Sequence, residues 1–104
     1  MHGRMARYRI SGDPHELARK AEEGMLPIFE AQPGFRAYNL AVSGDTLTSM
    51  SAWDTSEQAE AASPAAATWI AENIAEDIEL IDVQLTEILL ATALGVSAAA
   101  TAKA

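Results

Sequence analysis

Residues 32–54 constrain the fold of this chain more than any other stretch. The segment begins with Gln-Pro-Gly-Phe, continues through an apolar run to a Ser-Gly-Asp turn at 43–45, and ends with a second extended run that closes on Trp53. Gly34 suits the positive φ angle that often ends a helix, and two extended runs joined by a short glycine-containing turn pair as an antiparallel hairpin. The segment therefore predicts a helix, a hairpin and a second helix, in that order.

Patterns on either side complete the order of elements. Residues 5–10 alternate between the two faces of a strand, and residues 80–90 alternate again, with Ile81 and Val83 on one face. Asp13 suits the N-cap of the first helix, and Thr55 or Ser56 suits that of the second. The predicted elements are a strand over 5–10, a helix from Pro14 to Pro33-Gly34, strands over 35–42 and 46–53, a helix after Thr55, and a strand over 80–90.

Two prolines predict irregular helices. Pro27 lacks a hydrogen-bond donor and crowds the preceding turn, so we expect a kink or a tightened turn near Met25. Ser63-Pro64 has the composition of a break and a new start. The second helix is therefore expected to split at 62–64.

The element order is that of a ferredoxin-like α+β domain. Strand, helix, strand, strand, helix, strand (βαββαβ) forms a four-stranded antiparallel sheet with both helices on one face. We expect one such domain over residues 1–90 and an Ala-rich C-terminal tail over 91–104 that is disordered or weakly helical. The uncovered face of the sheet predicts a second copy packed sheet to sheet.

Composition limits the partners of the chain. It has no cysteine, which excludes disulfides and thiolate metal sites, and its two N-terminal histidines do not form a metal cluster. The net charge is −8, and nearly all basic residues precede residue 37, so no basic stripe is available for nucleic acid or an anionic membrane. With no signal peptide or membrane-spanning stretch evident, we expect a soluble cytoplasmic protein.

Two motifs resemble the antibiotic-biosynthesis monooxygenase (ABM) superfamily. They are Gln-Pro-Gly-Phe at 32–35, after an amphipathic helix, and Ser-Met-Ser-Ala-Trp-Asp-Thr-Ser-Glu-Gln-Ala at 49–59, running from strand into helix. The resemblance covers about residues 5–90. It implies a homodimer that forms a dimeric α+β barrel and a cofactor-independent oxygenation of a small quinol or phenol. The haem-degrading branch of the superfamily uses a helix histidine as its iron ligand. In this chain Ser63 stands near that position, so the histidine ligand is missing there.

Six residues are candidates for lining a pocket between sheet and helices: Trp53, Asn39, Tyr38, Tyr8, Phe35 and Trp69. Trp53 matches the strand-end tryptophan of the superfamily, which the resemblance places at the pocket, although such a ring equally suits the core. By alternation Asn39 shares a face with Phe35 and Ala37, where its amide suits an enolate oxygen of the substrate. An exposed amide is the alternative.

Charged side chains leave the chemistry open. Arg7, Arg9 and Arg36 either anchor an anionic ligand or, as we favour, pair with acids such as Asp82 across the sheet. His15 has the chemistry of a general base, but its place in the first helical turn favours exposure. We assign no catalytic residue. The two functional hypotheses are a cofactor-independent monooxygenase and a non-catalytic dimeric binding or structural domain of the same fold.

Overall fold

The computed structural model describes residues 1–101 and has the predicted order of elements. The strands and helices are β1 (His2–Ile10), α1 (Pro14–Glu30), β2 (Phe35–Ser43), β3 (Thr46–Trp53), α2 (Ser56–Asn73) and β4 (Ile78–Glu87), followed by η1 (Thr92–Leu94) and α3 (Ala98–Thr101). The ferredoxin-like βαββαβ arrangement is confirmed.

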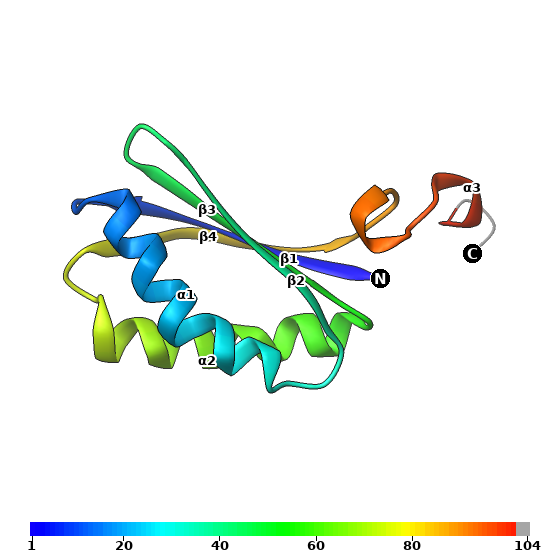
Figure 1. Cartoon of the computed structure of the whole chain (residues 1–104), viewed down its shortest axis with the longest axis horizontal. Helices are drawn as coiled ribbons and strands as arrows, with labels where there is room; N and C mark the ends of the chain where they lie inside the picture. The colour runs from blue at the N-terminus through cyan, green and yellow to red at the C-terminus, as the bar shows by residue number, and fades with distance from the viewer. Residues whose placement is uncertain (102–104) are drawn as a thin grey trace.

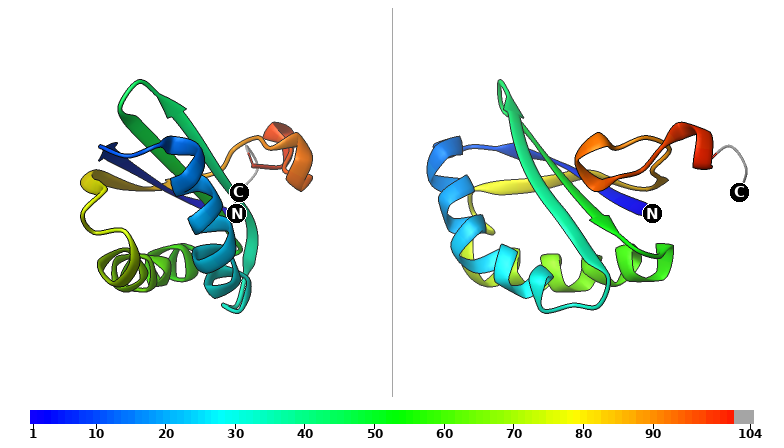
Figure 2. Two further views of the ribbon diagram at one scale, coloured as in Figure 1. Left: turned by 60° about the vertical axis from the view of Figure 1, so that its left-hand side comes forward. Right: turned by 45° about the vertical axis from the view of Figure 1, so that its right-hand side comes forward.

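The four strands form one antiparallel sheet in the order β2-β3-β1-β4. β1 is central and pairs with β3 on one side and β4 on the other. Both long helices cover the same face of the sheet, and the other face carries no helix (Figures 1 and 2). The sheet therefore has an inner face, toward α1 and α2, and an outer face.

The two motifs of the sequence meet at the end of the hairpin. The backbone N–H of Asp54 donates to the carbonyl oxygen of Gly34 (3.0 Å), and the rings of Phe35 and Trp53 pack edge to face with centroids 5.4 Å apart. Gly34 has a φ angle of 80°, and a Cβ there would overlap the side chain of Gln58. Thus the Pro-Gly-Phe turn fits directly against the start of α2.

Both predicted helix starts are present. The side chain of Asp13 accepts a hydrogen bond from the His15 backbone (3.1 Å), with Pro14 at the first helical position. Thr55 and Gln58 form a capping box, in which each side chain bonds the other residue's backbone N–H. These caps satisfy backbone donors that the first turn of a helix leaves unpaired.

The predicted break in the second helix is wrong. α2 runs without interruption through Pro64, and its buried stripe of small residues, Ala59, Ala62 and Ala66, continues across the proline. Pro64 itself is exposed, so water can reach the carbonyl that loses its hydrogen-bond donor. Packing of this alanine stripe against the sheet outweighs the local preference for a break. α1 likewise continues through Pro27.

Two β-bulges change which side chains face the helices. In β4, Leu80 pairs with Tyr8 and Asp82 with Arg7, so Ile81 is skipped, and the predicted sharing of a face by Ile81 and Val83 is wrong. In β2 the register shifts between Phe35 and Ala37. A bulge adds one residue to a strand, so simple alternation fails beyond it.

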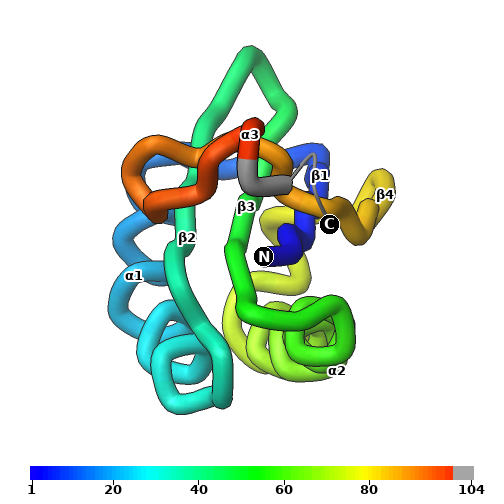
Figure 3. Tube along the Cα trace, turned by 90° about the vertical axis from the view of Figure 1, so that its right-hand side faces the viewer, coloured from blue at the N-terminus to red at the C-terminus, as the bar shows by residue number. Residues whose placement is uncertain are grey.

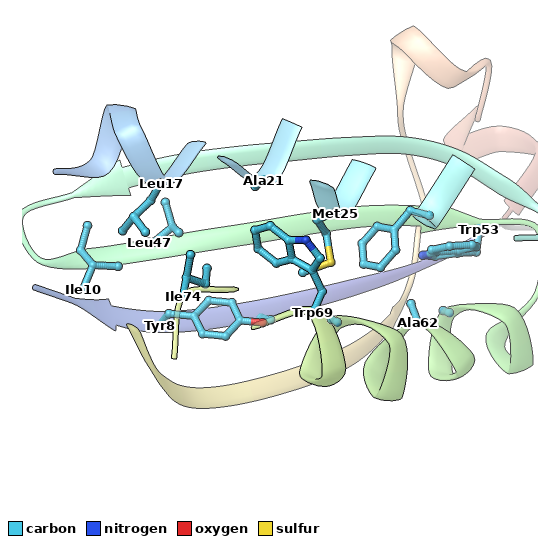
Figure 4. Packing of buried hydrophobic residues seen from close by; sticks show 14 residues of the cluster. Tyr8, Ile10, Leu17, Ala21, Met25, Leu47, Trp53, Ala62, Trp69 and Ile74 are labelled. Carbon is cyan, nitrogen blue, oxygen red and sulfur yellow. The ribbon is translucent and has the colours of Figure 1, made fainter. Parts of the chain in front are cut away.

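The core lies between the inner face of the sheet and the two helices. Figure 4 shows Leu17, Ala21 and Met25 from α1 facing Trp69 from α2, with Leu47 and Tyr8 on the sheet beneath them. A Cβ at Gly24 would overlap the indole of Trp69, so glycine lets this ring approach the α1 backbone closely. The two largest fully buried side chains are Phe29 and Trp53.

The C-terminal segment continues beyond β4 as a short ordered turn. Ala91 and Val96 exchange backbone hydrogen bonds (3.0 Å each) around η1, where Gly95 has a φ angle of 73°. Figure 3 shows this segment crossing the end of the sheet near the N-terminus. The last residues of the predicted tail, 102–104, lie outside the described residues. No helix within residues 1–101 is long and apolar enough to cross a membrane.

Candidate functional site

A groove of about 410 Å³ lies between α2 and the sheet, along β4. Its walls are mostly apolar, and the polar side chains among them come from β1 and α2. This volume is within the range of small-molecule sites, about 300–1,000 Å³. The lining consists of Ser63, Ala67, Ile70, Ala71 and Ala75 from the α2 side, Ile78, Leu80 and Val83 from β4, and Arg4 and Tyr8 from β1.

A small cavity of about 20 Å³ lies deeper, between sheet and helices. It shares Arg4, Tyr8, Ile70 and Ile78 with the groove, so the two spaces adjoin. The deeper cavity has room for about one water molecule. A ring-sized ligand therefore fits the groove, whereas the space under α1 is already filled by side chains.

Arg4 is the charged residue at the junction of the two spaces. Only 4% of it is exposed, and its Nε donates a hydrogen bond of 2.8 Å to Oγ of Ser63 on α2. The alternation that points Ala6 and Tyr8 inward extends to Arg4, because β1 begins at His2 and not at residue 5. Continuing the alternation of 5–10 by one residue toward the N-terminus was the signal in the sequence for Arg4, and the predicted strand ended just short of it.

The three arginines predicted as ligand anchors or ion-pair partners form ion pairs. Arg7 Nη2 lies 2.6 Å from Asp82 Oδ2, Arg9 Nε lies 3.8 Å from an oxygen of Asp45, and Arg36 Nε lies 2.6 Å from Asp54 Oδ1. The hydrogen bond with Arg7 lowers the pKa of Asp82. These pairs are at the surface, and none of the three arginines lines the groove between α2 and β4. The cross-strand interpretation is confirmed for Arg7 and Asp82.

Tyr8 and Trp69 line the deeper cavity, and Tyr8 also reaches the groove. Tyr8 is 6% exposed and Trp69 is 9% exposed. In Figure 4 the Tyr8 ring lies along β1 below the Trp69 indole, which projects from α2 toward the sheet. Of these two predicted residues, Tyr8 thus lies at the inner side of the groove, whereas Trp69 lines only the deeper of the two spaces.

Tyr38 lines the deeper cavity beside Ser49, to which its side chain is hydrogen-bonded. Its ring packs edge-on against Phe29 with centroids 5.3 Å apart. Burial raises the pKa of Tyr38 to about 12, partly offset by the hydrogen bond with Ser49. The phenol therefore stays protonated at neutral pH.

Phe35 and Trp53 belong to an aromatic cluster around Phe29. The Trp53 ring lies 5.6 Å from that of Phe29, and its Nε1 donates to Oγ of Ser51 at 2.9 Å. Trp53 has no exposed surface, and neither it nor Phe35 contributes to the lining of the groove or the deeper cavity. Both residues pack in the core at the far end of the hairpin.

Asn39 lies on the outer face of the sheet. Because of the bulge before Ala37, Asn39 and Phe35 lie on opposite faces of the sheet. The prediction that Asn39 shares a face with both Phe35 and Ala37 is therefore wrong for Phe35 and correct for Ala37. Asn39 is exposed and pairs in register with Met50 of β3, which itself pairs with Met5 of β1. The amide is thus separated by the sheet from Tyr8, Tyr38 and the groove.

No histidine, aspartate or glutamate is among the groove-lining residues named above. His15 is exposed in the first turn of α1, as predicted. Within residues 1–101, no group of three or more histidine or acidic side chains is placed to hold a metal ion. The polar chemistry available to a ligand in the groove is that of Arg4, Ser63 and Tyr8.

Comparisons with known proteins identify the fold. No family model and no curated protein matches the sequence. Among solved structures, the chain is similar to SnoaB, a cofactor-independent oxygenase from Streptomyces nogalater, with a TM-score of 0.68, 17% identity, and coverage of 86% of this chain and 94% of SnoaB. A protein from Chloroflexus aurantiacus assigned as an antibiotic-biosynthesis monooxygenase gives a TM-score of 0.65 and 22% identity over 90% of this chain and 98% of that one.

MupZ from Pseudomonas fluorescens shares the same arrangement at lower sequence identity. Its TM-score is 0.67 with 11% identity, and the match covers 81% of this chain and 69% of MupZ. At such identities a structural likeness is evidence for the fold, and function is argued from the site. The resemblance seen in the two motifs is thereby confirmed at the level of the fold.

Proposed function

We propose that this chain, which has the fold of the ABM-like proteins, binds a small aromatic molecule in the groove between α2 and β4 and acts on it as a cofactor-independent oxygenase. The observation that carries the proposal is the groove itself, about 410 Å³ with mostly apolar walls and a few polar side chains. Apolar walls with a few convergent polar groups are typical of small-molecule sites. The similar structure of SnoaB, a cofactor-independent oxygenase, supports the class of reaction.

The lining of the groove narrows the proposed substrates. Cofactor-free oxygenation requires a substrate that loses a proton and passes electrons from its carbanion to O₂. Since the described lining holds no histidine or carboxylate to act as a base, the substrate must itself be acidic, as anthrones and dihydroxyanthracenes are. For an anthrone, the net reaction with O₂ converts the ring methylene into a carbonyl: one oxygen atom enters the substrate and the other leaves as water. The protein contributes orientation and exclusion of water.

The active form is proposed to be a homodimer joined through the outer face of the sheet. That face presents half-buried Met5 and Met50 together with Ala37 and Ala52 around a depression of about 220 Å³. Leu94 of the C-terminal segment lines the same depression. A second sheet packed there would cover this surface without blocking the groove, which lies on the opposite side of the sheet.

The proposal is tested by oxygen uptake and ligand binding with a variant that fills the groove. Ala67 lies on the groove side of α2, and Ala67→Phe would occupy the space of a ring without touching the core. Ala61→Phe adds the same side chain at an exposed α2 position outside the groove lining and is the matched control. The substrates are anthrones, dihydroxyanthracenes and hydroquinones, each measured against the rate in buffer.

We expect uptake above the buffer rate that falls at least tenfold in Ala67→Phe and is unchanged in Ala61→Phe. Binding without uptake, lost in Ala67→Phe alone, would support the alternative of a non-catalytic binding domain and contradict the oxygenase assignment. If no member of the panel binds, or if both variants behave as the wild type, the groove is not the site.

A further inference from the structure

Arg4 is a buried cation with a neutral partner. It is 4% exposed, and the acceptor of its Nε hydrogen bond is the hydroxyl of Ser63. Arg7, Arg9, Arg19 and Arg36 all form ion pairs at the surface, whereas within residues 1–101 no carboxylate lies within ion-pairing distance of Arg4. Arginine remains protonated in proteins, so the positive charge of Arg4 stays inside the fold uncompensated.

The neighbours of Arg4 do not supply the missing negative charge. Tyr38 is near enough to interact electrostatically with Arg4, but its burial raises the pKa of Tyr38 to about 12, so the phenol is neutral at pH 7. The groove lining that Arg4 shares contains no aspartate or glutamate. Burying a charge without an opposite charge opposes folding. An anion bound to Arg4 would supply the opposite charge.

The position of Arg4 links this charge to the groove. Arg4 and Ser63 are joined by a hydrogen bond in the groove lining, and Tyr8, Ala67, Ala71 and the apolar side chains of β4 complete the walls. A guanidinium forms strong, directional hydrogen bonds with carboxylate and similar oxyanions. The site thus complements a ligand with a flat apolar body and one anionic group at its end.

We propose that Arg4 is an anion receptor and that the groove between α2 and β4 selects small aromatic anions, whose carboxylate or phenolate oxygen binds the Arg4 guanidinium and the Ser63 hydroxyl. This inference rests on the proposed function, because it assigns the chemical class of the ligand in the same groove. It extends that function by making ionisation of the ligand a requirement for tight binding.

Matched probes test the charge requirement by isothermal titration calorimetry at low salt. 2-Naphthoate and 2-naphthamide have the same ring and nearly the same shape, but only the first is an anion. 4-Nitrophenolate at pH 8 and 4-nitroanisole form the corresponding pair for a phenolate. Each pair is titrated into the full chain and into Arg4→Met, with Arg7→Met as control, because Arg7 lies on the same strand but faces the outer side.

We expect at least one anion to bind tenfold or more tightly than its neutral partner in the wild type and in Arg7→Met. In Arg4→Met the difference should vanish, with the neutral probe still bound at about its wild-type affinity. Which pair shows the preference identifies the carboxylate or the phenolate as the anionic group. Equal binding of anion and neutral partner would overturn the anion receptor and leave the aromatic groove intact, whereas no binding of any probe would overturn both.

Thermal melts of the free protein separate a binding role of Arg4 from a purely structural one. If Arg4 serves a ligand, Arg4→Met removes an unpaired buried charge, and the melting temperature of the free protein should stay equal or rise. Arg4→Lys keeps the charge and should keep part of the preference for the anion. A large fall in the melting temperature of Arg4→Met, together with equal wild-type affinity for both members of each pair, would assign Arg4 to structure alone.

Discussion

Tyr38 couples the protonation of one side chain to the stability of the core. Its pKa is raised to about 12 by burial, against the ordinary value of 10.0, so the folded state favours the neutral phenol. The stabilisation from this group is complete below pH 10, because both states are then protonated. It is lost as the pH rises from 10 to 12, because the unfolded chain ionises first.

We therefore predict that the free energy of unfolding falls more steeply between pH 10 and 12 in the wild type than in Tyr38→Phe. Two pKa units correspond to about 2–3 kcal/mol at the upper end of this window. Urea denaturation at pH 7, 10, 11 and 12 measures the difference between the two proteins. Parallel curves across the range would show that Tyr38 ionises as easily in the folded state as in water.

Substitution of Trp53 distinguishes a role in packing from a role in ligand binding. Because it is fully buried against Phe29 and Phe35, Trp53→Ala should lower the free energy of unfolding by about 3–5 kcal/mol. Trp53→Phe, which keeps a ring but loses the hydrogen bond to Ser51, should cost less. A loss of ligand affinity in Trp53→Phe at unchanged stability would instead place Trp53 at the site.

At the scale of elements, the junction between the hairpin and α2 depends on Gly34. A Cβ at this position would overlap the Gln58 side chain that caps α2, and the φ angle of 80° disfavours any other residue. Gly44, in the hairpin turn, has a φ angle of 59° but no neighbour within contact distance of a Cβ. A substitution at either glycine would therefore strain the backbone, and only at Gly34 would the new side chain also meet a packing constraint.

We predict that Gly34→Ala lowers the free energy of unfolding by about 2–4 kcal/mol, from left-handed strain, the lost cap and the overlap. Gly44→Ala should cost about 1–2 kcal/mol, from strain alone. Chemical denaturation of both variants measures the difference. Equal costs would mean that Gln58 moves aside freely and that the cap contributes little.

Pro64 tests the continuity of α2. Because the helix passes through this residue, Pro64→Ala restores a backbone donor at an exposed position and should stabilise the protein by about 1–3 kcal/mol. For a domain of this size, each kcal/mol raises the melting temperature by roughly 4–8 °C. A lower melting temperature would contradict the view that Pro64 destabilises α2.

At the scale of the whole molecule, the outer face of the sheet is the proposed dimer surface. Met50 lies at its centre, in register with Met5 and Asn39 on the neighbouring strands. We predict that the wild type elutes as a dimer in light-scattering chromatography and that Met50→Glu, which buries a charge in the interface, shifts it to a monomer. Ala61→Glu, with the same new charge on exposed α2, should remain dimeric. A wild-type monomer would contradict the proposed barrel.

The order of elements, both helix caps and the hairpin followed from the sequence, because they depend on local features: alternation, cap residues, and glycines at turns. The alternation of residues 5–10, which places Ala6, Tyr8 and Ile10 in the core, followed in the same way. The two motifs also indicated the fold that similar solved structures confirmed. Local sequence patterns and the two short motifs were sufficient to predict these features.

Tertiary structure decided the rest, because it depends on contacts between residues distant in sequence. A β-bulge moved Asn39 to the outer face, and packing of an alanine stripe carried α2 through Pro64. The sequence predicted an arginine partner for Asp82, but the tertiary structure selected Arg7, 75 residues away, and buried Arg4 against Ser63, 59 residues away. The packing of α2 on the strands determines which arginine forms an ion pair at the surface. It also determines which arginine lies beside the groove without an acidic partner.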